Sequence, residues 1–97
     1  MDNFRIEAFD NLFEAVLKLK DIEECRKFFE DVCTIKELQD IAQRLEVAKL
    51  LSGGKNYQEV CRLTGASTAT ISRVNKCLLY GRGGYKTVLS NGGKKNV

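Results

Sequence analysis

Residues 57–76 read YQEVCRLTGASTATISRVNK, and this stretch has the pattern of a helix-turn-helix unit. Gly65 stands where the turn between the two helices needs a positive φ, and Ser67 stands where the second helix would begin. Small or apolar residues occupy the positions at which the two helices would cross. We therefore predict a helix-turn-helix over about residues 57–79, with a packing core of Val60, Cys61, Gly65, Ile71 and Val74.

The remaining side chains of the second helix are free to face solvent, and most are short hydroxyls, methyl groups or cations. Such groups can bond phosphate oxygens and base edges, and a methyl group can contact thymine. The first helix adds its N-terminus, where a phosphate is favoured. Arg73 and Lys76 could act as phosphate contacts or as base readers. The predicted DNA-binding residues are Tyr57, Gln58, Ser67, Thr68, Ala69, Thr70, Ser72, Arg73 and Lys76.

Charge is distributed unevenly along the chain. Residues 1–59 hold nine Lys or Arg against thirteen Asp or Glu, whereas residues 60–97 hold seven Lys or Arg and no acidic residue. A basic segment beside an acidic scaffold is typical of a protein that binds phosphate groups. For the last twelve residues, the alternative is a solvated basic tail without a binding role.

The composition argues against enzymatic and metal-binding functions. The 97 residues include no histidine, and the four cysteines form no Cys-x-x-Cys pair, so we expect reduced core cysteines, no metal site, no cofactor and no enzyme. The alternative for the cysteines is a four-thiolate zinc or redox site. No apolar run is long enough to span a membrane, and no secretory signal begins the chain. We therefore expect a cytoplasmic protein that does not associate with membranes.

Apolar spacing and capping residues predict further helices before the helix-turn-helix. A helix is expected over residues 3–20, a second follows an Asp21 cap as far as Val32, and a third opens at a Thr34–Glu37 capping box and stops at residues 52–54. The second should bury Cys25, Phe28, Phe29 and Val32, and the apolar surface that receives the two phenylalanines could belong to another subunit. The fold class is therefore all-α.

The domain organisation follows from a change of composition after residue 80. We predict a single helical domain over residues 1–80 and a Gly/Lys-rich C-terminal tail over residues 81–97. A short extended or helical piece could include Val88 and Leu89, and residues from Ser90 onward have too little apolar surface to fold. A chain this small buries a modest core, so a partner subunit would help to stabilise it.

Residues 34–78 resemble the Trp-repressor family, and in particular its YerC/YecD branch. The resemblance is carried by the run LLSGGKNYQEV over residues 50–60 and most specifically by GASTATISR over residues 65–73, which is close to the GAGIATITR run of the repressor. It implies an all-helical, intertwined homodimer in which the N-terminal helices form much of the interface. Two reading helices would then enter successive major grooves of double-stranded DNA at a palindromic site, with half-sites about 34 Å apart.

The resemblance also locates the ligand site of the family. The repressor holds its tryptophan co-repressor partly with an arginine that corresponds to Arg73, and a second arginine falls near Arg44. A glycine follows the first arginine in the family and makes room for the indole ring, but this chain has Val74 there, and Cys77 replaces a serine. We therefore predict that the chain does not bind tryptophan as the repressor does, and the sequence identifies no other effector.

Two functions fit these observations. The first is a sequence-specific transcriptional regulator, a repressor that reads a palindromic site and does not respond to tryptophan. The alternative is a helical protein-interaction adaptor that does not bind DNA, in which the segment 57–76 only packs and the acidic half binds a partner. A salt series separates the two, because DNA affinity falls steeply with ionic strength.

Overall fold

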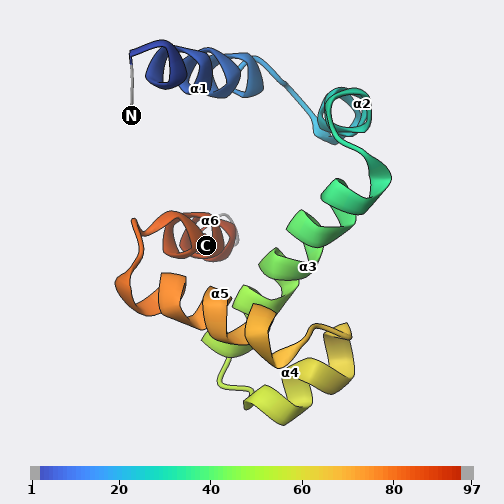
Figure 1. Ribbon diagram of the computed structural model, residues 1–97, viewed down its shortest axis with the longest axis vertical. Helices are drawn as coiled ribbons and strands as arrows, with labels where there is room; N and C mark the ends of the chain where they lie inside the picture. Colours follow the sequence, from blue (N-terminus) through green and yellow to red (C-terminus); the bar gives the residue numbers. More distant parts are fainter. Residues whose placement is uncertain (1–2, 95–97) are drawn as a thin grey trace. The chain divides into compact units, whose positions relative to one another are not determined.

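A computed structural model describes residues 3–94 of the chain, with side chains over residues 5–90. The described residues form six helices and no strand (Figure 1), so the all-α fold class is confirmed. They are α1 (Asn3–Val16), α2 (Ile22–Val32), α3 (Ile35–Ser52), α4 (Tyr57–Thr64), α5 (Thr68–Tyr80) and α6 (Gly84–Lys94). The chain divides into two compact units, and the division lies between Leu38 and Gln39 within α3. The single domain over residues 1–80 stays a prediction.

Helix α1 ends earlier than the sequence predicts, at Val16 instead of Lys20. The N–H groups of Lys18 and Leu19 donate to carbonyls three residues back, at 3.1 Å each, so the last turn tightens and the helix does not continue. Asp21 then takes an extended conformation and caps α2, where its side chain accepts from the Glu24 N–H at 2.9 Å. Glu24 Oε1 in turn accepts from the Lys20 N–H at 2.8 Å. Asp21 therefore caps α2 as predicted, but Glu24 reaches back to the N–H of Lys20, the residue before the cap, and not to that of Asp21 as in a reciprocal capping box.

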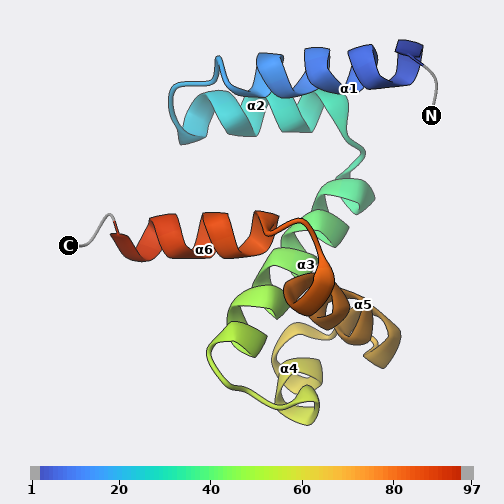
Figure 2. The ribbon, with the colours of Figure 1, turned by 90° about the vertical axis from the view of Figure 1, so that its left-hand side faces the viewer.

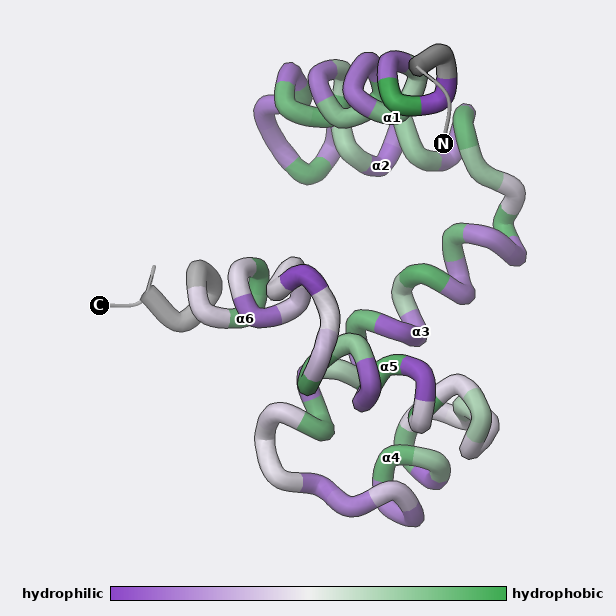
Figure 3. The backbone as a smooth tube through the Cα atoms, turned by 60° about the vertical axis from the view of Figure 1, so that its left-hand side comes forward, coloured by the Kyte–Doolittle hydropathy of each residue, from purple (hydrophilic) through white to green (hydrophobic). Residues whose placement is uncertain are grey.

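The first unit has an amphipathic sequence but no buried residue in α2. Figure 3 shows hydrophobic residues recurring between hydrophilic ones along α1 and α2. The prediction that α2 buries Cys25, Phe28, Phe29 and Val32 is wrong for the single chain, because no residue of α2 is buried and Val32 is 55% exposed. The periodicity correctly marks an apolar face, but it does not say whether the same chain covers that face.

The second unit holds the buried core. Its six buried apolar residues come from α3, α4, α5 and the turn before α5; they are Val47, Ala48, Val60, Ala66, Ile71 and Val74. Figures 1 and 2 show α5 crossing the C-terminal half of α3, with α4 beside both. The capping box of α3 forms as predicted, because Thr34 Oγ1 accepts from the Glu37 N–H at 3.1 Å and Glu37 Oε1 accepts from the Thr34 N–H at 2.8 Å.

Beyond residue 80 the structure differs from a plain tail. Gly83 adopts a φ of 85°, and α6 follows it over Gly84–Lys94, with the Thr87 N–H donating to the Gly83 carbonyl at 3.0 Å. Tyr85 and Leu89 pack against the core of the second unit, which gives this weakly helical sequence an apolar anchor. The expected lack of structure from Ser90 onward therefore does not hold for the part of α6 up to Lys94, and residues 95–97 lie outside the described residues.

Candidate nucleic-acid interface

Helices α4 and α5 and the turn between them form the predicted helix-turn-helix. Asn56 caps α4, and its side chain accepts from the Glu59 N–H at 2.9 Å. The chain leaves α4 through Gly65, whose φ of 74° lies in the left-handed region that residues with a Cβ disfavour. Ser67 then caps α5, accepting from the Thr70 N–H at 3.1 Å. Local hydrogen bonds therefore define both helix starts and the turn.

Packing between the two helices uses the residues at the crossing. Val60 and Ile71 are completely buried, and Val74 is 1% exposed. Cys61 is half-buried, and its Sγ donates to the Ala66 carbonyl at 3.1 Å. Of the five residues proposed for the packing core, Gly65 is exposed in the turn and the other four lie at the crossing. The burial of Ile71 and Val74 fixes which face of α5 points outward.

The outward face of α5 carries the side chains proposed to contact DNA. Most of them are exposed, and Thr70 is half-buried; the residues on this face and on the preceding cap are Ser67, Thr68, Ala69, Thr70, Ser72, Arg73 and Lys76. Tyr57 and Gln58 are exposed on the first turn of α4. We call these nine residues the reading face. Exposed hydroxyls together with Arg73 and Lys76 can donate hydrogen bonds to phosphate and base acceptors.

A neighbouring pair of charges affects the first turn of α4. Lys55 Nζ lies 3.8 Å from Glu59 Oε2, and both side chains are largely exposed. Glu59 is the acidic residue of that turn, so its carboxylate adds negative charge close to the helix N-terminus. Lys55 places a positive charge beside this carboxylate, next to Tyr57 at the start of the helix.

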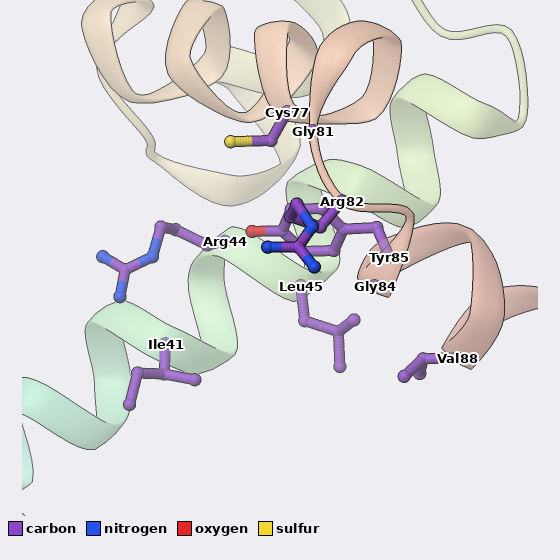
Figure 4. A pocket seen from close by; sticks show the side chains of 9 residues that line it. All are labelled: Ile41, Arg44, Leu45, Cys77, Gly81, Arg82, Gly84, Tyr85 and Val88. Atoms are coloured by element: carbon purple, nitrogen blue, oxygen red, sulfur yellow. The ribbon is translucent and has the colours of Figure 1, made fainter. Parts of the chain in front are cut away.

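An apolar groove of about 720 Å³ lies in the same unit, and it shares no lining residue with the reading face. Figure 4 shows its lining side chains, which come from α3, from the end of α5 with the following loop, and from α6; they are Ile41, Arg44, Leu45, Cys77, Gly81, Arg82, Gly84, Tyr85 and Val88. Neither Arg73 nor Val74 is among them. Of the two arginine positions that the resemblance assigns to the family's ligand site, Arg44 lines the groove and Arg73 is exposed on the reading face.

Other kinds of site find no support in the described residues. Nowhere between residues 5 and 90 do three or more Cys, Asp or Glu side chains gather in a way that could hold a metal ion. The four cysteines are free thiols. Over the same described range, the helices are too short or too polar to cross a bilayer.

The described residues, with a capped helix-turn-helix and a cationic outer face, have the architecture of the helix-turn-helix class of proteins. The chain belongs to the Trp repressor family and, within that family, to the YerC-like group. The family's sequence profile, described as Trp repressor protein, matches residues 7–92. It is 53% identical to YerC of Bacillus subtilis (strain 168) over 89 residues, which cover 92% of this chain and 86% of YerC.

Solved structures support the same assignment. A TrpR-like protein from Eubacterium eligens ATCC 27750 is 52% identical and superposes with a TM-score of 0.87 over 90% of each chain. A candidate Trp repressor from Staphylococcus aureus is 42% identical, with a TM-score of 0.88 over 96% of this chain and 95% of that one. The fold and the family predicted from residues 34–78 are thus confirmed over nearly the whole chain, and membership of this family indicates a DNA-binding regulator.

Proposed function

We propose that the protein is a sequence-specific transcriptional regulator, a cytoplasmic repressor that binds a palindromic DNA site as a homodimer. The observation that carries this proposal is the outward orientation of the reading face on α5. This face points outward because Ile71 and Val74, on the opposite side of α5, are buried together with Val60 of α4. Seven cations and no acidic residue occur from residue 60 onward, so the electrostatic field near this face favours a polyanion.

Within the reading face, the residues would divide into two roles. Arg73 and Lys76 reach farthest and bind phosphate oxygens or guanine acceptors, whereas Thr68, Ala69 and Ser72 lie near base edges. Tyr57 and Gln58, at the N-terminus of α4, contact the phosphate backbone of the DNA. Because Ser and Thr bond several bases, each contact discriminates modestly, and a good one contributes about 1 kcal/mol.

The proposed dimer is supported by apolar surface that the single chain leaves open. Phe9 is 46% exposed and Phe13 57% on α1, and Leu17, directly after the end of that helix, is 83% exposed. Ile41, Leu45 and Val88 on the second unit are also exposed, and they line the apolar groove. Exposed apolar surface on this scale is typical of an interface with another protein, and the resemblance of the chain to the Trp repressor favours a second copy.

The proposal excludes a tryptophan response and an enzymatic activity. Val74, which replaces the glycine of the repressor, belongs to the buried core, so the space beside Arg73 is filled by a branched side chain. Membership of the Trp repressor family, whose members are regulatory DNA-binding proteins, supports a binding function in place of a catalytic one.

A salt series with duplex DNA tests the proposal. Binding should be measurable at about 50 mM salt. The logarithm of the association constant should fall linearly with the logarithm of the salt concentration. A random duplex pool should then yield an inverted repeat, because a dimer with two-fold symmetry reads two half-sites. If no duplex of any sequence binds at about 50 mM salt, the protein-interaction adaptor becomes the better account.

A further inference from the structure

A hydrogen bond joins the scaffold helix α3 to the end of the helix-turn-helix's first helix. Gln43 Nε2 donates to the Thr64 carbonyl oxygen at 3.2 Å, across 21 positions of sequence, and the bond is partly buried. Thr64 is the last residue of α4, where helix carbonyls lack the partner that the next turn would supply. Gln43 therefore supplies a hydrogen-bond donor to this carbonyl and connects α3 to the end of α4.

The Thr64 side chain connects the end of α4 to the turn before α5 through two hydrogen bonds. Its Oγ1 donates to the Val60 carbonyl at 2.7 Å and accepts from the Ala66 N–H at 3.1 Å. The Ala66 carbonyl accepts from Cys61 Sγ, also at 3.1 Å. Both backbone polar groups of Ala66 are thus bonded, and this residue directly precedes the Ser67 cap of α5. A displacement of Thr64 would consequently move the start of the reading helix.

Apolar contacts alone fix the orientation of the helix-turn-helix on α3 less closely than a hydrogen bond does. Val47 and Ala48 of α3 pack with Ile71 and Val74 of α5, but burial of apolar surface is non-directional and tolerates small rotations. A hydrogen bond depends steeply on angle and distance. The geometry points to Gln43 as a positioning residue that sets the orientation of the helix-turn-helix on α3, an inference that rests on the proposed DNA-binding function.

Orientation affects specific and non-specific binding differently. Sequence is read through base contacts that require the reading helix at a defined angle in the groove, whereas non-specific binding depends mainly on charge near the phosphates. Gln43 has no net charge and is not on the reading face. Its loss should therefore lower the ratio of specific to non-specific affinity while it leaves non-specific affinity unchanged.

The test uses Gln43→Met, which keeps an unbranched side chain of similar length and removes the donor. The matched control is Gln39→Met, which makes the same change one turn earlier on α3 at an exposed position. The probes are a duplex selected by the wild-type protein and an unrelated duplex of equal length. We expect Gln43→Met to weaken binding to the selected duplex roughly tenfold and binding to the unrelated duplex less than about twofold. Gln39→Met should change neither.

Two further measurements distinguish positioning from a loss of folding. Gln43→Lys restores an N–H donor and should return the affinity ratio towards that of the wild type. Amide hydrogen exchange at Ala66 should become faster in Gln43→Met and not in Gln39→Met, and this measurement needs no DNA. An unchanged affinity ratio, or unchanged exchange at Ala66, would overturn the inference. If the wild-type chain binds no duplex, the proposed function fails, and faster exchange at Ala66 would still show that Gln43 holds the turn.

Discussion

Ser67 Oγ lies 3.1 Å from the backbone nitrogen of Thr70 and 3.1 Å from Thr70 Oγ1. It accepts the Thr70 N–H as the N-cap of α5, and its own hydroxyl donates to the Thr70 hydroxyl. The first turn of the reading helix is therefore held by one serine through two bonds. Because Thr70 Oγ1 accepts from Ser67, the Thr70 hydroxyl proton is free to be donated elsewhere.

Replacing Ser67 by Ala should reduce the free energy of unfolding by about 1 kcal/mol, because the Thr70 N–H loses its acceptor. Ser67→Gly should cost only a few tenths of a kcal/mol, since glycine is itself tolerated as an N-cap. Urea denaturation followed by circular dichroism provides the measurement. Ser72→Ala, at an exposed position within α5, serves as the control, and an equal loss in that variant would argue against the capping role.

The turn glycine should be sensitive to any side chain. Gly65→Ala forces a residue with a Cβ to adopt a φ of 74° and should cost about 1–2 kcal/mol, although no atom lies within 4 Å of the added Cβ. Gly84→Ala is the matched control, because Gly84 begins α6 without a positive φ and its Cβ also meets nothing within 4 Å. Equal unfolding free energies for the two variants would contradict a conformational role for Gly65.

The two cations of the reading face should account for part of the salt dependence of DNA binding. The double substitution Arg73→Ala with Lys76→Ala should weaken binding and reduce the slope of log affinity against log salt by about 2, if both side chains bind phosphates. Lys18→Ala with Lys20→Ala removes the same charge from exposed positions in the acidic half and should leave the slope nearly unchanged. Loss of the helical signal in the first double variant would instead assign these residues a structural role.

A carboxylate placed on the apolar stripe of α1 should dissociate the proposed dimer. Phe13 is 57% exposed in the single chain, and Phe13→Asp would put an unpaired charge into the interface. Sedimentation equilibrium should then give a mass near 10.9 kDa in place of twice that value. Asn11→Asp introduces the same group at another exposed position on α1 and should leave the dimer intact. A wild-type protein that sediments as a monomer would count against the dimer itself.

Tryptophan should not bind in the manner of the repressor, because Val74 occupies the position that glycine has in that protein and is buried in the core. Isothermal titration calorimetry should therefore show no saturable heat in the micromolar range. Saturable binding with one site per subunit would refute this prediction and would require Val74 to move out of the core.

Local sequence determined much of the helix-turn-helix. The caps of α2, α3, α4 and α5 each join residues three positions apart, so a pattern such as Thr34 with Glu37 predicts its own hydrogen bonds. The turn at Gly65 was likewise predictable, because few residues other than glycine adopt its conformation readily. The spacing of Val60, Ile71 and Val74 then defined the inner side of the unit and, by exclusion, the reading face.

Contacts between distant residues could not be predicted in this way. The bond from Gln43 to Thr64 spans 21 residues, and an isolated glutamine in a helix carries no sequence signal for such a partner. Helix α6 begins at a glycine, and its Tyr85 and Leu89 pack against the core. By itself, the sequence determined the presence of α1 to α5, the turn and the outward chemistry of the reading face, since these follow from local conformational preference and periodicity. Only the tertiary structure decided how the helix-turn-helix is oriented on α3, because this orientation depends on side chains that folding brings together.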